Sequence, residues 1–108
     1  MSGLAAALEA LHATLESRKG ADPKSSYVAQ LYGKGLDVML KKLAEESGEV
    51  LIAAKNGDRA ELVHEAVDLL FHLFVLLADQ DIAPADLAAE LDRRSGRSGL
   101  DEKASRGT

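Results

Sequence analysis

The chain has 108 residues, which suits a single domain and leaves no room for a second core of comparable size. Its 18 acidic residues outnumber its 13 basic residues, giving a formal net charge of -5, and no stretch concentrates enough lysine and arginine to bind nucleic acid. With no cysteine, no leader-like segment and no apolar run long enough to cross a bilayer, the sequence predicts a cytoplasmic, soluble protein without a membrane partner.

The first third of the chain predicts two helices separated by a loop. Alanine and leucine dominate the apolar residues and only two prolines interrupt the chain, which favours an all-α fold. A helix over 4–16 is predicted by leucines that recur at helical spacing, namely Leu4, Leu8, Leu11 and Leu15. Turn and capping residues follow over 17–26, and a short helix over 27–32 should come next.

Two long helices joined by a short turn are predicted in the middle of the chain. After a glycine-rich break, a helix should run over 36–55 until Asn56 and Gly57 end it. Asp58 can then cap a helix over 59–79, the most apolar part of the chain. On the first of these two helices, a broad apolar face is expected to pack in the core: Leu36, Met39, Leu40, Leu43, Ala44, Val50, Leu51 and Ala54.

The last predicted helix covers 84–94 and begins at Pro84, a residue that suits the first helical turn. After Gly96 the sequence turns polar. We therefore expect an all-α domain over 1–96, a bundle of four to five helices, and a polar, flexible C-terminal tail over 97–108. The helix over 59–79 is apolar over too much of its circumference to be covered by one layer of neighbouring helices. The sequence therefore predicts at least a dimer.

Two pairs of carboxylates stand at matching positions on the two long helices. Glu46 with Glu49, and Glu65 with Asp68, are each three residues apart and project from one face of their helix. The short turn should make the helices an antiparallel hairpin, so the pairs can meet at one level. Four carboxylates at close range repel one another unless a multivalent cation neutralises them, and hard oxygen ligands select Mg²⁺ or Mn²⁺. The pattern thus favours metal-assisted hydrolysis of a phosphorylated substrate.

Two other interpretations of these side chains stay open. Acidic stripes are also the normal solvated face of amphipathic helices. A di-iron carboxylate site uses Glu-x-x-His spacing, which Glu9 with His12 and Glu61 with His64 both satisfy. We expect these histidines to lie on the surface or in helix packing, and His72 to be a hydrogen-bond partner beside the acidic stripe.

Beyond this pattern, two motifs resemble the EExxE…ExxD signature of the all-α NTP pyrophosphatase superfamily, to which MazG-like proteins and dimeric dUTPases belong. They are Glu45-Glu46-Ser47-Gly48-Glu49 and Glu65-Ala66-Val67-Asp68. Within that superfamily, the chain from its first helix to Arg94 resembles the phosphoribosyl-ATP pyrophosphatase family. The further segments that carry the likeness are Ser26-Tyr27, Gly33-Lys34-Gly35-Leu36-Asp37, Lys41-Lys42, Ala53-Ala54-Lys55-Asn56-Gly57-Asp58 and Leu69-Leu70-Phe71-His72-Leu73.

The resemblance implies a MazG-like bundle completed by dimerisation. It also implies the second step of histidine biosynthesis, in which water and phosphoribosyl-ATP give phosphoribosyl-AMP and pyrophosphate with Mg²⁺, or Mn²⁺ in its place. Carried over by position, Glu46, Glu49, Glu65 and Asp68 are the expected metal ligands. Glu45 is expected to orient or deprotonate the attacking water, although it could equally pair with a neighbouring lysine.

Five basic residues are the candidates for holding the substrate phosphates: Lys34, Lys42, Lys55, Arg93 and Arg94. For Lys34, which stands between two glycines, the alternative is a solvated turn residue. For the two arginines, the alternative is a favourable interaction with the C-terminus of the last helix.

Two other functions remain open at this point. The first is a nucleotide-pool enzyme of the same fold that cleaves dUTP, dCTP or aberrant NTPs with the same carboxylates. The second is a helical interaction module without catalysis. The chain lacks the length and the Cys/His set expected of a fusion with the cyclohydrolase of the next step, so a stand-alone enzyme is expected.

Overall fold

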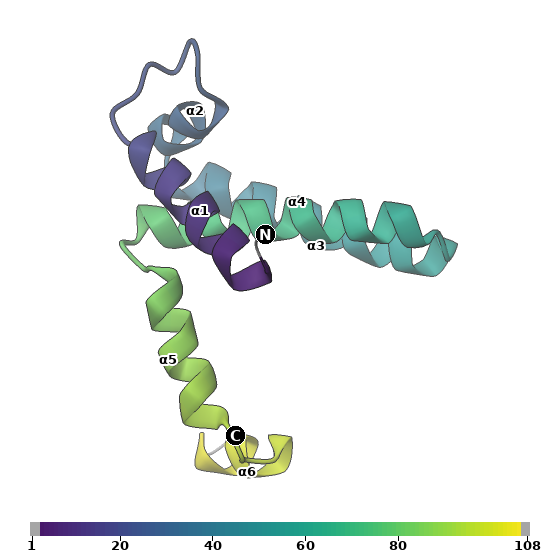
Figure 1. The fold of residues 1–108 in the computed structure, drawn as a ribbon. Coiled ribbons are helices and arrows are strands. Elements are labelled where there is room, and N and C mark those ends of the chain that lie inside the picture. The colour runs from purple at the N-terminus through teal and green to yellow at the C-terminus, as the bar shows by residue number, and fades with distance from the viewer. Residues whose placement is uncertain (1–2, 107–108) are drawn as a thin grey trace.

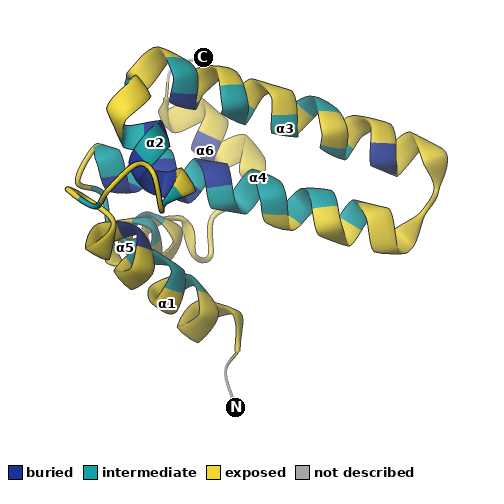
Figure 2. Cartoon of the chain, turned by 90° about the horizontal axis from the view of Figure 1, so that it is seen from above, coloured by how far each residue is buried: buried dark blue, intermediate teal, exposed yellow. Residues whose placement is uncertain are grey.

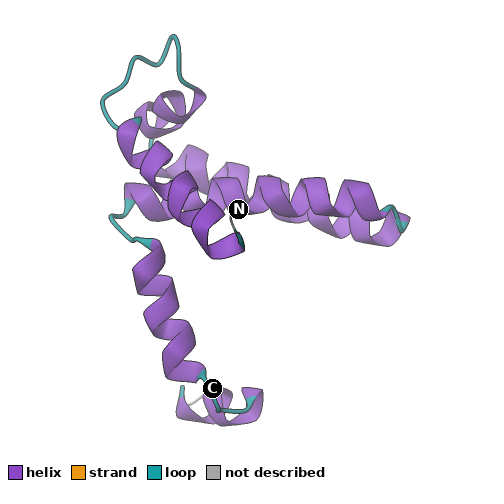
Figure 3. Ribbon diagram, in the orientation of Figure 1, coloured by secondary structure: helices purple, strands orange, loops and turns teal. Residues whose placement is uncertain are grey.

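The computed structural model describes residues 3–106, which form six helices and no strand. The helices are α1 Leu4–Ser17, α2 Tyr27–Lys34, α3 Leu36–Asn56, α4 Arg59–Asp79, α5 Pro84–Arg94 and α6 Gly99–Ser105. The all-α prediction is therefore confirmed (Figure 3). The five predicted helices are found within two residues of their expected ends.

Local capping explains why the central helices begin and end where they do. The Ser26 hydroxyl accepts a hydrogen bond from the Ala29 N–H at the start of α2, and the Asp58 carboxylate accepts one from the Glu61 N–H at the start of α4. Gly57 ends α3 in the left-handed conformation, with φ of 70°. These capping residues were the ones that the sequence indicated.

The break between α2 and α3 lies at Gly35 rather than after Tyr32. Gly33 and Lys34 continue the helix, because a glycine inside a helix is tolerated at a modest cost. Gly35 has φ of 94° and ψ of 178°, a conformation open almost only to glycine. The chain can therefore change direction within one residue, and α2 folds back against α3.

The helices pack around a hairpin made by α3 and α4, which run antiparallel and side by side (Figure 1). At one end of this hairpin, α1 lies across α4 and α2 packs on α3, while the other end projects without a neighbour (Figures 1 and 2). The buried core lies at the covered end and consists of Leu15, Val28, Leu31, Met39, Phe74, Val75 and Ala78.

The apolar face predicted for α3 lies only partly in the core. The expectation was wrong for several leucines of this face. Leu36, Leu40 and Leu51 are 45%, 44% and 68% exposed, whereas Met39 and Ala53 are buried. The reason is that α4 packs against the face that carries the two buried residues. The leucine stripe lies beside this contact and remains uncovered in a single chain.

The C-terminal part forms an arm of α5 and α6 that points away from the hairpin (Figure 1). Helix α6 was not predicted, because the segment after Gly96 is polar and carries no apolar stripe. It begins at a Ser98 cap, and Arg93 on α5 contacts the buried Glu102 at 2.6 Å. Arg93, together with Arg94, also holds the pKa of Glu90 down to about 2. The division into a domain over 1–96 and a tail stays a prediction.

Among residues 3–106, no helix combines the length and the apolar character that a membrane crossing requires.

Candidate metal centre

On α4, three potential ligands lie on adjacent turns of one helix face. Glu65 and Asp68 are three residues apart, and His64 is one turn before Asp68. One ligand atom from each of these residues lies within 4.8 Å of the others. The nearest contact is between His64 Nε2 and the Asp68 carboxylate, at 3.3 Å.

The second pair of carboxylates approaches from α3. Glu46 is directed toward α4, and its side chain is only 14% exposed. Partial desolvation raises the pKa of Glu65, and the charges of Asp68, Glu49 and Glu46 raise it further, while His64 opposes them. The charges of the two predicted pairs thus act on one another across the hairpin, while the potential ligands within 4.8 Å of one another in the described part of the chain all belong to α4.

The chemistry of these donors fits a hard divalent cation. The cluster of Glu46, Glu49, Glu65 and Asp68, called the carboxylate cluster below, offers oxygen ligands from two facing helices. Within residues 3–106, its ion-pair partners are histidines alone, at 3.3 Å for Asp68 and 4.0 Å for Glu46. A multivalent cation would therefore relieve a repulsion that these histidines compensate only in part.

Glu45 and Lys42 lie beside the cluster on α3 and contact each other. Lys42 Nζ is 3.5 Å from the Glu45 carboxylate, which is the alternative that the sequence left open for Glu45. The negative charge that Tyr27 carries when ionised, and then the charges of Glu45 and Glu46, raise the pKa of Lys42, while desolvation lowers it. Lys42 therefore lies between the start of α2 and the carboxylate cluster, where a phosphate could reach it.

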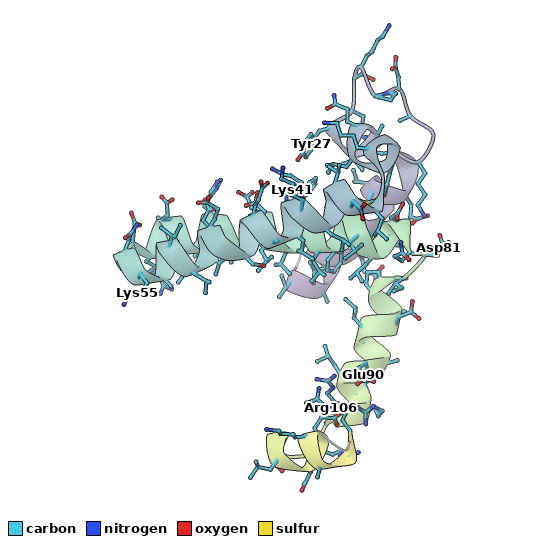
Figure 4. All side chains as sticks on the ribbon, turned by 180° about the vertical axis from the view of Figure 1, so that it is seen from behind. Tyr27, Lys41, Lys55, Asp81, Glu90 and Arg106 are labelled. Atoms are coloured by element: carbon cyan, nitrogen blue, oxygen red, sulfur yellow. The ribbon has the colours of Figure 1, made fainter. Side chains whose placement is uncertain are left out.

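His72 connects the cluster to α2. Its Nδ1 lies 3.0 Å from the carbonyl oxygen of Asp68, and its Nε2 lies 3.2 Å from the hydroxyl of Tyr27. The hydrogen-bonding role expected for His72 is thus confirmed. Tyr27, which the sequence had not singled out by itself, stands over α3 near the labelled Lys41 (Figure 4).

The other predicted phosphate-binding residues are spread over the molecule. Lys55 lies at the open tip of the hairpin, six residues and about 9 Å of helix beyond Glu49 (Figure 4). Lys34 ends α2. Arg93 and Arg94 end α5 and both bind Glu90, so the structure does not bring them to the cluster within one chain.

The di-iron alternative finds no support in the geometry. His12 and Glu9 are on α1, and the group of potential ligands found in the described part of the chain includes neither. His64 is exposed rather than placed in the bundle interior, where a di-iron site needs it.

A groove of about 330 Å³ lies elsewhere, between α1, α4 and α5. Its walls are almost wholly apolar, with Leu8, Leu73 and Leu87 among the lining residues. Such a surface suits apolar side chains and offers no cation to a polyphosphate.

The chain is similar in sequence to a known protein family and to individual enzymes. Residues 8–95 match the family model described as phosphoribosyl-ATP pyrophosphohydrolase. The chain is 54% identical to the phosphoribosyl-ATP pyrophosphatase of Rhodobacter capsulatus, over 94% of this chain and 98% of that protein. It is 57% identical to the enzyme of the same name from Geobacter sulfurreducens, over 92% of each. A histidine biosynthesis bifunctional protein of Deinococcus radiodurans is 54% identical over 92% of this chain, which spans 45% of that protein.

Proposed function

Since the chain belongs to the phosphoribosyl-ATP pyrophosphohydrolase family, we propose that it hydrolyses phosphoribosyl-ATP to phosphoribosyl-AMP and pyrophosphate, the second step of histidine biosynthesis. One water is consumed, the P–O bond between the α- and β-phosphates breaks, and pyrophosphate leaves. The observation that carries this proposal is the carboxylate cluster, with two carboxylates on α3 and two on α4. All four residues lie inside the matched segment 8–95.

Glu46, Glu49, Glu65 and Asp68 are the residues that would hold the metal in this reaction. Their shared negative charge and oxygen donors support Mg²⁺, with Mn²⁺ as a substitute. When bound, Mg²⁺ would screen the polyphosphate, polarise the phosphorus under attack and make water a better nucleophile.

Glu45 accepts the proton of the attacking water in this proposal. Its carboxylate is half-exposed and pairs with Lys42 at 3.5 Å, so it lies at the solvent side of the cluster. A substrate phosphate competes for Lys42, because a phosphate oxygen is also an anionic partner. Binding of the substrate therefore releases Glu45 to act on water.

Among the basic residues, Lys42 is the one that the geometry favours as a phosphate ligand, because it is next to the cluster. Lys34 and Lys55 lie at the two ends of α3, roughly 30 Å of helix apart, so one substrate molecule could reach only one of them. Arg93 and Arg94 reach a substrate only by giving up their ion pairs with Glu90 or by acting on another chain.

Pyrophosphate release is the experiment that tests the proposed activity. We expect rapid release from phosphoribosyl-ATP with Mg²⁺, little from ATP, dUTP or dCTP, and none with EDTA. A preference for dUTP, dCTP or another free NTP would instead support the nucleotide-pool enzyme. Failure to cleave any of these substrates would favour the helical interaction module.

We further propose that the chain acts as a homodimer or a higher homo-oligomer in the cytoplasm. Its accessible surface of 7372 Å² is about 1,600 Å² larger than expected for a compact monomer of 11.5 kDa. Its radius of gyration of 16.0 Å also exceeds the roughly 13 Å of a compact chain of this length. A standard interface covers about 800 Å² of each partner, so the excess is about twice what one such interface would cover and suits a larger interface or more than one neighbouring copy. The cysteine-free sequence suits a reducing compartment.

The apolar side chains along the free half of the hairpin are the expected interface. Leu51 and Val67 are 68% and 57% exposed there. We expect sedimentation velocity to give a dimer for the natural chain, and the double variant Leu51→Glu/Val67→Glu to sediment as a monomer because charges cannot be buried unpaired. Thr14→Glu, at an exposed position of α1, is the control and should leave the dimer intact. A monomeric natural chain at micromolar concentration would contradict the proposal.

A further inference from the structure

His72 is a buried polar side chain that the proposed reaction does not use. It is 8% exposed and lies edge-on to the rings of Phe71 and Tyr27, whose centroids are 5.1 Å and 6.1 Å away. A hydrophobic side chain would fill this space at less cost, because a buried imidazole needs hydrogen-bond partners for its nitrogens. A buried imidazole at this position therefore favours a role in which the nitrogens matter.

The hydrogen bonds fix which nitrogen carries the proton. Nδ1 faces the backbone carbonyl of Asp68 at 3.0 Å, and a carbonyl only accepts, so Nδ1 must donate. In the neutral ring Nε2 is then the acceptor, and the Tyr27 hydroxyl at 3.2 Å donates to it. Tyr27 is itself held by a stacked contact with Phe71 at 6.4 Å. The ring of His72 is thus fixed in its tautomer and in its orientation.

The same nitrogen lies near the carboxylate cluster. The Glu46 carboxylate lies 4.0 Å from Nδ1, and within residues 3–106 this is the only ion-pair contact found for Glu46. A movement of about 1 Å would bring it to hydrogen-bond distance, where the N–H could be shared with the Asp68 carbonyl. Carboxylates that bind metals are commonly oriented by such an outer hydrogen bond.

The geometry points to His72 and Tyr27 as positioning residues of the metal centre: the Nδ1–H of His72 orients the Glu46 carboxylate, and the Tyr27 hydroxyl holds the imidazole in place by donating to Nε2. This inference rests on the proposed function, because it presumes that Glu46 is a metal ligand. It also assigns a role at the carboxylate cluster to Tyr27, which stands at the start of α2, 45 residues from His72 in sequence.

Three substitutions separate the two nitrogens. In His72→Asn, the side-chain amide can take the place of Nδ1–H, whereas in His72→Gln the longer amide reaches the position of Nε2. Tyr27→Phe keeps the ring that stacks on Phe71 and removes the hydroxyl alone. We expect His72→Gln to weaken Mg²⁺ binding about 10- to 100-fold, as other outer-shell losses do. His72→Asn should retain most of the affinity, and Tyr27→Phe should fall between them.

The readouts are Mg²⁺ titration by calorimetry on the full chain without substrate, and the ¹⁵N chemical shifts of the His72 ring. We expect the proton on Nδ1 in the natural chain and also in Tyr27→Phe, because the Asp68 carbonyl accepts from Nδ1 in both proteins. A proton on Nε2 in the natural chain, or equal Mg²⁺ affinities in all four proteins, would overturn the positioning role alone. Loss of thermal stability with unchanged affinity would identify His72 as a packing residue. A natural chain that binds no Mg²⁺ would overturn the proposed function and this inference together.

Discussion

Replacing Asp68 by asparagine is expected to lower kcat/KM for phosphoribosyl-ATP by about 100-fold or more, with the fold intact. The substitution removes one negative charge from the carboxylate cluster and keeps the size of the side chain. The rate falls because the remaining donors hold the metal less well. Glu49→Gln removes a charge from the facing helix and should have a similar effect.

The stability of the metal-free protein should respond to Asp68→Asn in the opposite direction from its activity. Partial desolvation and the neighbouring carboxylates raise the pKa of Glu65 in the folded chain. A carboxyl whose pKa is raised on folding destabilises the folded state above its ordinary pKa, and this penalty disappears when the pH falls below that value. Asp68→Asn removes one source of the shift. Without metal, its melting temperature near pH 7 should therefore equal or exceed that of the natural chain.

Glu61→Gln is the matched control for these measurements. Glu61 lies one turn before Glu65 on the same stripe of α4 and is exposed. Glu61→Gln therefore removes one negative charge, as Asp68→Asn does, but at a position outside the carboxylate cluster. It should keep nearly full activity. Circular dichroism reports the fold of each variant. A collapsed Asp68→Asn protein, or one that is as active as Glu61→Gln, would refute the metal-site assignment.

Removal of metal is the second change with a large expected effect. EDTA should abolish pyrophosphate release, and Mg²⁺ added in excess should restore it. Because a ligand that binds only the folded state stabilises it, Mg²⁺ at 100 times its Kd adds about 2.7 kcal/mol to the free energy of unfolding. For a chain of this size, the melting temperature should rise by about 10 °C.

General screening by salt must be separated from binding. Sodium chloride at the same ionic strength weakens repulsion between exposed carboxylates but does not occupy a site. It should therefore give a much smaller rise in melting temperature than Mg²⁺. Glu49→Gln should lose most of the Mg²⁺ effect and keep the sodium chloride effect. Equal responses to both salts would mean that the cluster is only a solvated acidic surface.

The sequence was most informative where local chemistry decides the structure. Ser26, Gly57 and Asp58 were recognisable as capping residues, because their side chains or backbone freedom act within one helical turn. The two carboxylate pairs were also predictable, since spacing on a helix and a short turn determine whether they can meet. The extension of α2 through Gly33 depends on a backbone angle at Gly35 that composition does not encode.

Contacts between helices were less predictable. The periodicity of α3 showed an apolar face with Met39, Leu40 and Leu51. It could not show that α4 would cover this face only at the edge with Met39, beside Glu46. Helix α6 begins at the Ser98 cap and contacts α5 through the ion pair between Arg93 and Glu102, which no periodic pattern announces. The contact of Tyr27 with His72 joins two helices that are distant in sequence, so no local pattern could reveal it.

The short turn at Gly57 also bears on how the protein folds. All five acidic candidates lie within residues 45–68, on the two arms that this turn connects. Bringing them together closes only a short loop, and the entropy lost in closing a loop grows with its length. Contacts of this local kind form quickly compared with those between distant segments. The hairpin can thus assemble the carboxylate cluster before α1 and α5 have docked, and a divalent cation present at that moment would favour the hairpin over the open chain.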